Sequence, residues 1–135
     1  MTIKKKSSVS IEGLTKAKAI LDQFSEDLTT EKDKTGVIKA FEFCYELSWK
    51  VIKKVLLFKG VDVGSPRDAF REAALNGIIE DPTPWFEFLK MRNRTVRTYD
   101  LGVLDEIVGM LPLFKKEISI LIEHLSKNIK QFNLG

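Results

Sequence analysis

Hydrophobic residues recur every three or four positions along most of the chain, which is the spacing of one face of an α-helix. Residues 9–29 are expected to form the first amphipathic helix. Its apolar positions are Leu14, Ala17, Leu21, Phe24 and Leu28. The polar segment 29–36 is expected to connect this helix to the next one. No segment alternates apolar and polar residues at the period of two that marks a β-strand.

The second predicted helix, residues 35–59, is apolar around most of its circumference. A helix of this kind must be contacted from several sides, so it is expected to be the centre of a bundle or an interface between subunits. Its apolar stripes include Phe58 and Cys44. A narrow polar strip carries Lys39, Glu42, Glu46, Lys50 and Lys53, in which Glu46 stands four residues before Lys50, an order that favours an ion pair.

Glycine, proline and capping residues divide the rest of the chain into helices. Gly60 is expected to end the second helix, and Ser65 followed by Pro66 predicts the start of a short third helix. Gly77 is poised to end that helix. Thr83 is the predicted N-cap of the next helix, with Pro84 at its first position.

The last helix is predicted to begin after Asp100 as its N-cap and to run to about Gln131. Pro112 lies inside it, so a kink is expected over residues 108–111. The whole pattern predicts an all-α fold, namely an up-and-down four-helix bundle with one additional short helix.

The segment from Trp85 to Asp100 places a cation within an apolar stripe. At the helical period Arg92 shares one face with Trp85, Phe88, Leu89, Val96 and Tyr99. A buried unpaired charge costs several kcal/mol, so this arginine must reach solvent, pair with an acid, face a second subunit or bind an anionic ligand.

A second face of the same helix is basic and carries Lys90, Arg94 and Arg97. With Arg92, four cations therefore lie within eight residues. Periodicity alone leaves two interpretations open, which are a structural arginine beside a solvated basic face and an anion-binding site.

Composition narrows the class of protein. The chain has 135 residues, of which 44% are hydrophobic and 30% are charged, as expected for one globular domain over residues 1–135 with a flexible basic arm at residues 1–8. The net charge of +3 permits nucleic-acid binding without indicating it. No run of 18 uncharged apolar residues occurs, so no membrane association is expected. The single cysteine, Cys44, is expected in the core, and a cytoplasmic location follows.

Several kinds of chemistry lack the residues that they need. One histidine and one cysteine cannot supply a zinc site or a Cys/His dyad, so no metal is expected. His124 is interpreted as a solvated histidine on the last helix. No glycine-rich phosphate loop is present, and no cofactor is expected.

Three ordered blocks of the sequence resemble a known family. They are Phe41-Glu42-Phe43-Cys44-Tyr45-Glu46-Leu47-Ser48-Trp49-Lys50, then Ser65-Pro66-Arg67-Asp68-Ala69-Phe70-Arg71-Glu72-Ala73, then Trp85 with Arg92-Asn93 through Thr98-Tyr99-Asp100. These blocks are similar to the nucleotidyltransferase substrate-binding protein family, the HepT-like branch of the HEPN helical domains. The likeness covers residues 10–125.

The resemblance implies a helical bundle that forms a homodimer and a minimal nucleotidyltransferase, encoded nearby, as its partner in a toxin–antitoxin-like module. Active members of that family cleave RNA without metal, using an arginine and a histidine across the dimer cleft. A tyrosine two positions after the histidine is nucleotidylated by the partner. The matching positions here are Arg92 for the arginine, Asn93 for its polar neighbour and Tyr99 for the tyrosine.

The position of the family's histidine is occupied by Arg97. An arginine stays protonated and cannot act as a general base, although it can hold a phosphate. We therefore expect nucleotide or RNA phosphate binding by Arg92, Asn93, Arg94 and Arg97, with cleavage lost or weak. In a continuous helix Arg92 and Arg97 would point about 140° apart. Sharing one phosphate would need a break after Val96 or residues from two subunits.

Three functions remain open at this point. The first is a non-catalytic or weakly catalytic subunit that binds a nucleotidyltransferase and is modified at Tyr99. The second is a metal-independent ribonuclease toxin in which Arg92 and Arg97, or another group, act in catalysis. The third is a structural dimerisation module, in which Tyr99 is a core tyrosine with its hydroxyl at the rim.

Overall fold

The computed structural model describes residues 11–97 and 100–128, and these residues form helices and turns without any strand. This confirms the predicted all-α fold, with four longer helices and one short helix. The helices are α2 (Ile11–Phe24), α3 (Glu31–Phe58), α4 (Pro66–Leu75), α5 (Thr83–Arg94), the 3-10 helix η1 (Thr95–Arg97) and α6 (Leu101–Lys127). The predicted basic arm at residues 1–8 lies outside the described residues.

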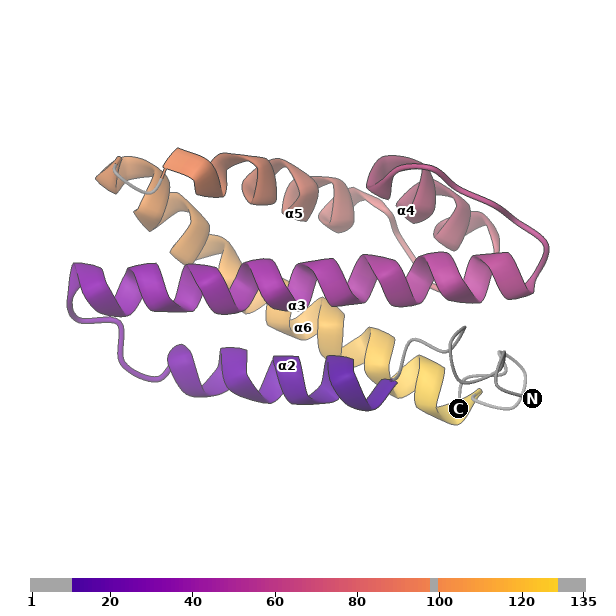
Figure 1. The fold of residues 1–135 in the computed structure, drawn as a ribbon, viewed down its shortest axis with the longest axis horizontal. Helices are drawn as coiled ribbons and strands as arrows, with labels where there is room; N and C mark the ends of the chain where they lie inside the picture. Colours follow the sequence, from indigo (N-terminus) through magenta and orange to yellow (C-terminus); the bar gives the residue numbers. More distant parts are fainter. Residues whose placement is uncertain (1–10, 98–99, 129–135) are drawn as a thin grey trace, which may run out of the picture.

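Helix α3 runs the length of the molecule and is its central element (Figure 1). Helix α2 lies along one side of it, α4 and α5 follow each other along the other side, and α6 crosses diagonally (Figure 1). Helix α3 packs against all four of these helices. The prediction that the most apolar helix would occupy the centre is therefore confirmed.

The start of α3 differs from the prediction. The segment 29–36 was expected to be a connection, but α3 already begins at Glu31 and α2 already ends at Phe24. The Thr30 hydroxyl accepts a hydrogen bond from the Asp33 amide at 3.0 Å, and the Asp33 carboxylate accepts one from the Thr30 amide at 3.0 Å. This reciprocal capping box fixes the first turn, so polar residues that suggest a loop in fact begin a helix.

The glycine and proline signals around α4 are confirmed. Gly60 and Gly77 have φ angles of 87° and 74°, which favour glycine after a helix end. The Ser65 hydroxyl accepts a hydrogen bond from the Asp68 amide at 3.2 Å, and Pro66 occupies the first turn of α4. These local contacts set where α3 ends and where α4 begins and ends.

The caps of α5 and α6 were predicted with mixed success. Helix α5 begins at Thr83 itself, and the side chain that accepts from the Thr83 amide, at 2.9 Å, is Asp81, so the prediction of Thr83 as N-cap was wrong. Asp100 caps α6 as predicted, because its carboxylate accepts from the Gly102 amide at 2.9 Å. Helix α6 continues through Pro112, and the predicted end near Gln131 lies outside the described residues.

A chain of aromatic rings joins four helices in the core. Phe41 of α3 contacts Phe114 of α6 with ring centroids 4.8 Å apart, and Phe114 contacts Phe88 of α5 at 5.0 Å. The chain continues from Phe88 to Trp85, then to Phe70 of α4 and back to Tyr45 of α3. All of these rings are buried, and such pairs contribute about 0.5–1.5 kcal/mol each beyond their burial.

The buried face of α3 also carries two ionisable groups. Cys44 is fully buried, as predicted, and burial raises the pKa of its thiol to about 12. Burial, with the nearby Glu46 carboxylate, raises the pKa of the Tyr45 hydroxyl as well. Phe58 was predicted on an apolar stripe of α3 but is exposed at the end of the helix. Within the described residues no helix is long and apolar enough to cross a membrane.

Candidate functional site

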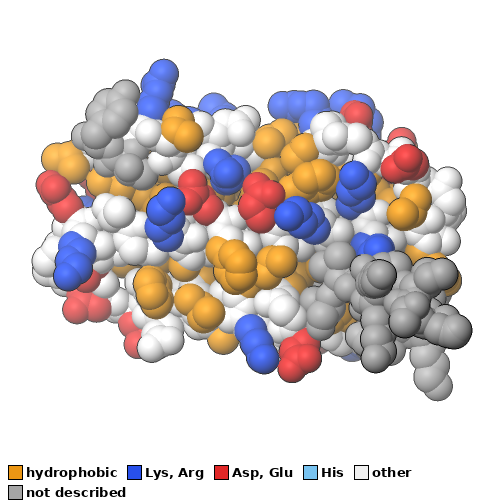
Figure 2. Space-filling view, viewed as in Figure 1, with side chains coloured by type: hydrophobic (Ala, Val, Ile, Leu, Met, Phe, Trp, Pro, Cys, Tyr) orange, Lys and Arg blue, Asp and Glu red, His pale blue; other side chains and the backbone are white. Residues whose placement is uncertain are grey.

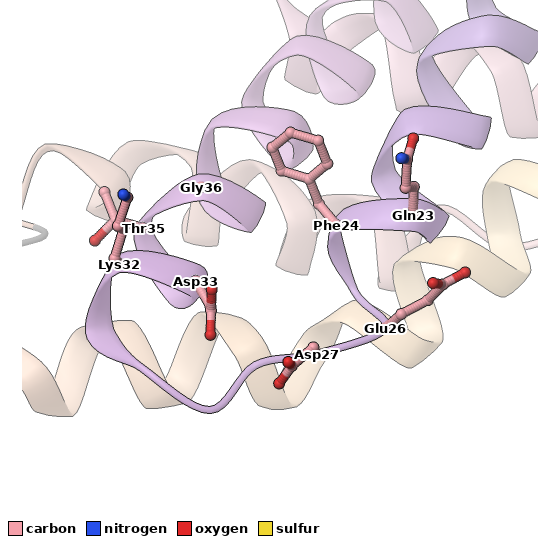
Figure 3. Close-up of a pocket in the computed structure, with 8 residues that line it drawn as sticks. All are labelled: Gln23, Phe24, Glu26, Asp27, Lys32, Asp33, Thr35 and Gly36. Atoms are coloured by element: carbon pink, nitrogen blue, oxygen red, sulfur yellow. The ribbon is translucent and has the colours of Figure 1, made fainter.

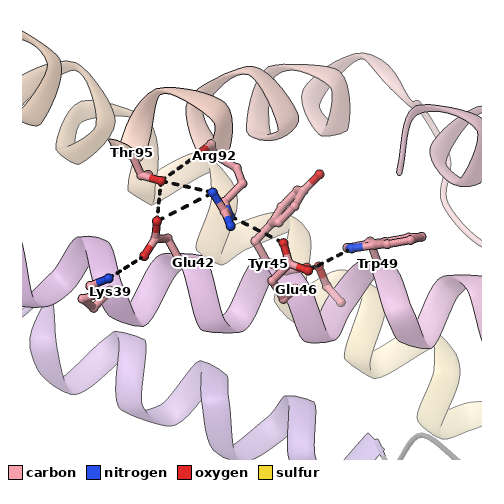
Figure 4. Close-up of polar contacts among 8 residues, drawn as sticks. Lys39, Glu42, Tyr45, Glu46, Trp49, Arg92 and Thr95 are labelled. Atoms are coloured by element: carbon pink, nitrogen blue, oxygen red, sulfur yellow. Dashed lines mark hydrogen bonds and ion pairs between the residues drawn. The ribbon is translucent and has the colours of Figure 1, made fainter. Parts of the chain in front are cut away.

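Arg92 lies between helices α5 and α3, where it faces two carboxylates (Figure 4). Its Nη1 atom is 3.7 Å from Oε2 of Glu42, and its Nε atom is 3.5 Å from Oε2 of Glu46. The antiparallel packing of α5 on α3 produces this arrangement, because it brings the end of α5 beside the first half of α3. Arg92 therefore pairs with acids of its own chain, which is one of the four roles that the sequence left open.

Thr95 completes this cluster. Its hydroxyl contacts the Glu42 carboxylate and lies 2.7 Å from the Arg92 carbonyl oxygen, and it accepts from Nη1 of Arg92 at 3.4 Å. A hydroxyl has one proton, so it can donate to only one of the two oxygens at a time. Thr95 is buried, and it is the first residue of η1. The end of α5 is thereby tied to α3.

Charge explains why the three ionic groups lie together. Glu42 and Glu46 are four residues apart on α3, so without a cation their carboxylates would repel each other on one helix face. Arg92 stands between them and neutralises this repulsion. The Arg92 side chain is 31% exposed, and the two carboxylates remain partly exposed, so the cluster lies at the surface rather than in the core.

Two neighbours of the cluster extend it along α3. Trp49 donates a hydrogen bond from Nε1 to Oε1 of Glu46 at 3.2 Å, and Lys39 lies 3.4 Å from Oε1 of Glu42 (Figure 4). The predicted Glu46–Lys50 ion pair is not among the ion pairs of the described residues. Glu46 is instead directed toward Arg92, which lies on a different helix.

The predicted apolar stripe of α5 is only partly correct. Trp85 and Phe88 are fully buried, but Val96 is 75% exposed. The cause is the change from α-helix to 3-10 helix after Arg94, which alters the rotation per residue, so that Thr95 is buried in place of Val96. A break after Val96 was one of the two conditions under which Arg92 and Arg97 could share a phosphate, whereas the change of helix type comes earlier, at Thr95. Tyr99 lies outside the described residues.

The remaining predicted site residues are divided between paired and exposed side chains. Arg94 pairs with Glu106 of α6. Lys90, Asn93 and Arg97 are at least partly exposed, and within the described residues neither Lys90 nor Arg97 belongs to an ion pair. The four cations therefore form no continuous basic face in the described part of one chain. Arg92 and Arg94 form ion pairs that anchor the end of α5, and the other two cations face solvent.

Two surface hollows lie away from this cluster. One is at the turn between α2 and α3, where Phe24 and Gly36 form the apolar part and Glu26, Asp27 and Asp33 stand around it (Figure 3). The other lies between the end of α4 and α6 and includes Glu80, Asp81, Glu117 and His124. His124 is half-buried there, so its interpretation as a solvated side chain was incomplete. No group of three or more potential metal ligands occurs in the described part of the chain.

Sequence reasoning did not identify Glu42, Glu46 and Thr95 as members of the site. The two glutamates fit a solvated strip, although two acids four residues apart on one helix do favour a nearby cation that offsets their repulsion. That pattern was the signal available. No feature of the sequence indicated that Thr95 would be buried, because its burial depends on the 3-10 turn.

Comparison with known proteins gives consistent results. Residues 9–127 match the family described as nucleotidyltransferase substrate binding protein like. A Haemophilus influenzae protein named "Probable ribonuclease HepT" is 37% identical over an alignment of 95 residues, which covers 67% of this chain and 65% of the relative. The match thus spans a little less than two thirds of that relative's length.

Two solved structures share the fold. A crystal structure from Thermus thermophilus has a TM-score of 0.78 at 25% identity and covers 83% of this chain and 98% of its own. A Haemophilus influenzae structure, described as showing the fold of a substrate binding domain of a nucleotidyltransferase, has a TM-score of 0.77 at 28% identity, with coverage of 87% and 99%. With the family match over residues 9–127, these likenesses show that the chain belongs to the nucleotidyltransferase substrate binding protein-like family.

Proposed function

We propose that this chain is a helical subunit that binds a separate minimal nucleotidyltransferase, and that it cleaves RNA weakly or not at all. The family match and the description of the Haemophilus influenzae structure as a substrate binding domain support the first half of the proposal. The pair would form a toxin–antitoxin-like module.

The contacts of Arg92 support the proposal that RNA cleavage is weak or absent. Its guanidinium is held by Glu42 and Glu46, and the position five residues later is Arg97, which cannot take up a proton at neutral pH. The chain has one histidine, His124, and it lies on α6 beside a different hollow. The described part of the chain therefore offers an arginine without the imidazole that a metal-independent cleavage would use as base.

The anion-binding residues that we propose are Arg92, Asn93, Arg94 and Arg97, in a cleft that a homodimer completes. Asn93 and Arg97 are at least partly exposed and can contact a phosphate directly. Arg92 and Arg94 already neutralise glutamates, so within one chain they attract an anion weakly. A second subunit would add its own Arg97 and raise the local positive charge.

Tyr99 is the residue that we propose as the site of nucleotidylation. The test is incubation with the partner enzyme and ATP, followed by peptide mapping. The chain has two tyrosines, and Tyr45 is buried in the core, so it serves as an internal control. Adduct on the peptide that contains Tyr99, lost in Tyr99→Phe, is expected. An unmodified Tyr99 would leave this tyrosine with only a packing role.

Binding of the partner is tested separately by titration calorimetry with the purified nucleotidyltransferase. We expect a saturable complex that does not require ATP, because substrate binding precedes group transfer. Absence of binding at concentrations of tens of micromolar would contradict the proposed function.

A metal-independent ribonuclease is the second candidate, and one contact favours it. The Glu42 carboxylate touches both Arg92 and Thr95, so a group able to accept a proton does lie beside the arginine. The name of the Haemophilus influenzae relative points the same way. Cleavage that is lost in both Arg92→Ala and Glu42→Gln would select this candidate.

A further inference from the structure

Two aromatic rings near the junction of α3, α4 and α5 each have a cation over one face. The guanidinium carbon of Arg67 in α4 lies 5.2 Å from the centroid of the Phe86 ring in α5. Nζ of Lys53 lies 5.8 Å from the centroid of the Trp49 ring, one turn earlier on α3. Both rings are partly buried and pack against the core. The electrons of a ring face attract a cation in this position, so aromatic and cationic groups are presented together at the surface.

The two ring–cation pairs are neighbours across the packing of α4 on α3. Phe70, one turn after Arg67, contacts the ring of Tyr45, and Tyr45 lies one turn before Trp49. Helix α4 also packs against α5. Figure 2 shows hydrophobic side chains between cations over α3 and cations over α4. The pairs therefore belong to one surface.

Two further lysines border this surface. Lys50 precedes Lys53 by three residues on α3, and Lys90 follows Phe86 by four residues on α5. At these spacings each lysine lies on nearly the same helix face as its neighbour. We call the following residues the α3–α4–α5 patch: Trp49, Lys50, Lys53, Arg67, Phe86 and Lys90.

The chain itself does not neutralise the cations of this patch. Among the described residues none of its four cations belongs to an ion pair. Two acids close to it have other partners, since Asp68 lies 3.2 Å from Arg71 and Glu46 lies 3.5 Å from Arg92. Glu87 lies about 100° around α5 from the ring of the patch. The patch therefore favours an anionic ligand.

The rings decide between two kinds of anionic ligand. Arg67 is exposed, so its guanidinium has the Phe86 ring on one side and solvent on the other. Nucleobases stack on guanidinium planes as they do on aromatic rings, and lysines along the same surface neutralise successive phosphates. An acidic protein segment would use the charges but would have no base to stack. Single-stranded nucleic acid uses both features.

We propose that the α3–α4–α5 patch binds single-stranded nucleic acid, with a base against the Arg67–Phe86 pair and the flanking phosphates on the three lysines. This goes beyond the proposed function, in which phosphate binding is confined to residues 92–97 at the other end of α5. The patch holds a strand without cutting it, which suits a chain that cleaves RNA weakly or not at all.

The first test measures the phosphate contacts by fluorescence anisotropy with a labelled adenine decamer, as RNA and as DNA. Lys50→Gln/Lys53→Gln should raise the dissociation constant at least tenfold. The slope of log K against log salt should fall by about 1.4, because two phosphate contacts are lost. Lys32→Gln/Lys116→Gln removes the same charge at exposed positions outside the patch and should change the constant less than twofold. Circular dichroism should show all variants as helical as the parent.

The second test measures base stacking. Arg67→Lys keeps the charge and removes the guanidinium plane, so binding of the adenine decamer should weaken about fivefold or more at an unchanged salt slope. A decamer of abasic deoxyribose phosphates has no base to stack, and its binding should be the same in Arg67→Lys and the parent. Arg71→Lys, one turn further along α4, is the matched control and should leave the binding of both decamers unchanged.

Each contrary result rejects the proposal. A parent protein that binds neither adenine decamer at tens of micromolar has no such site. A loss in the control Lys32→Gln/Lys116→Gln as large as that in the patch variant would indicate attraction by net charge alone. A decaglutamate peptide that binds as tightly as the decamers, with no effect of Arg67→Lys, would assign the patch to an acidic protein segment.

One background separates the patch from the phosphate site at residues 92–97. The loss caused by Lys50→Gln/Lys53→Gln should persist in Arg97→Ala, and a loss that vanishes there would reject a separate site. Calorimetry with the nucleotidyltransferase is independent of these measurements. Failure to bind that enzyme, beside the expected results with the decamers, would reject the proposed function alone.

Discussion

The two ends of α5 stand in different environments although they belong to one helix of 12 residues. At its start, Trp85 and Phe88 are fully buried and contact rings from α4 and α6. At its end, Arg92 meets two glutamates of α3, and Arg94 meets one glutamate of α6. The first end is held by apolar burial, and the second by charges near the surface.

The position of a residue on a helix face does not by itself fix its environment. The part of the molecule packed opposite that residue matters as well. Phe88 and Arg92 lie four residues apart on nearly the same face of α5. What distinguishes them is the part of the molecule opposite each one, which is the Phe114 ring for Phe88 and the Glu42 and Glu46 carboxylates for Arg92. The contributions of the two ends to stability should differ accordingly.

Phe88→Ala should have the largest effect. Removing a fully buried ring leaves a cavity between Trp85 and Phe114, and such changes cost about 3–5 kcal/mol of unfolding free energy. Urea unfolding followed by circular dichroism measures it. Phe86→Ala, two residues away and only partly buried, is the control and should cost clearly less. Equal losses would show that the cost does not depend on how deeply the ring is buried.

Arg92→Ala should cost about 1–2 kcal/mol, because it leaves Glu42 and Glu46 without their shared cation while all three groups stay partly hydrated. A double-mutant cycle with Glu42→Gln should give a coupling energy on the order of 1 kcal/mol. Lys90→Ala, on the same helix without an ion pair among the described residues, should change stability by less than about 0.5 kcal/mol. An Arg92→Ala variant as stable as the parent would show that the carboxylates do not need the arginine.

The buried side of α3 should make the fold sensitive to alkaline pH. The pKa of the Cys44 thiol is raised from 9.0 to about 12, so its contribution to stability is complete below pH 9 and falls as the pH rises toward 12. At pH 10 the loss is on the order of 1 kcal/mol. The Tyr45 hydroxyl acts in the same direction from pH 10 upward.

Urea unfolding at pH 8, 9 and 10 measures this loss, and Cys44→Ala is the comparison. Its unfolding free energy should decline less steeply than that of the parent, whatever the cost of the substitution at neutral pH. Parallel declines in the two proteins would show that the thiol does not contribute.

Arg97→Ala should have the smallest effect on stability, within about 0.5 kcal/mol, because this side chain is exposed at the end of η1. Binding of a short oligoribonucleotide, measured by fluorescence anisotropy, should nevertheless weaken and depend less steeply on salt if Arg97 makes the proposed phosphate contact. Unchanged binding would remove Arg97 from the anion site. Lys116→Ala on α6 is a control of equal charge.

The parts of the fold that sequence predicted well depend on local chemistry. Ser65 before Pro66, Gly60 after α3 and Asp100 before α6 each act within a few residues of their own position, so their roles can be read without knowing the tertiary structure. The apolar circumference of α3 likewise indicated its central place. The capping box at Thr30 is equally local, but its polar residues also suit a connection, and the prediction placed one there.

The candidate site depends on contacts between residues that are far apart in the sequence. Arg92 and its partner Glu46 are separated by about half of α3 and all of α4, and only the packing of α5 on α3 brings them together. The prediction that Val96 lies on the apolar face was wrong for a different reason. A helical period extrapolated past Arg94 assumes a constant rotation, and the 3-10 turn changes it. The roles of Asn93, Arg97 and Tyr99 in binding or modification stay predictions.

The most direct measurement of the central claim is RNA cleavage by the purified protein in EDTA, with three variants prepared identically. We predict weak cleavage or none by the parent, clearly higher activity in Arg97→His, where an imidazole supplies the missing base, and loss of that gain in the Arg92→Ala/Arg97→His double variant. Strong cleavage by the parent that disappears in the single variant Arg92→Ala would contradict the account, because the arginine would then act in catalysis with a base other than histidine.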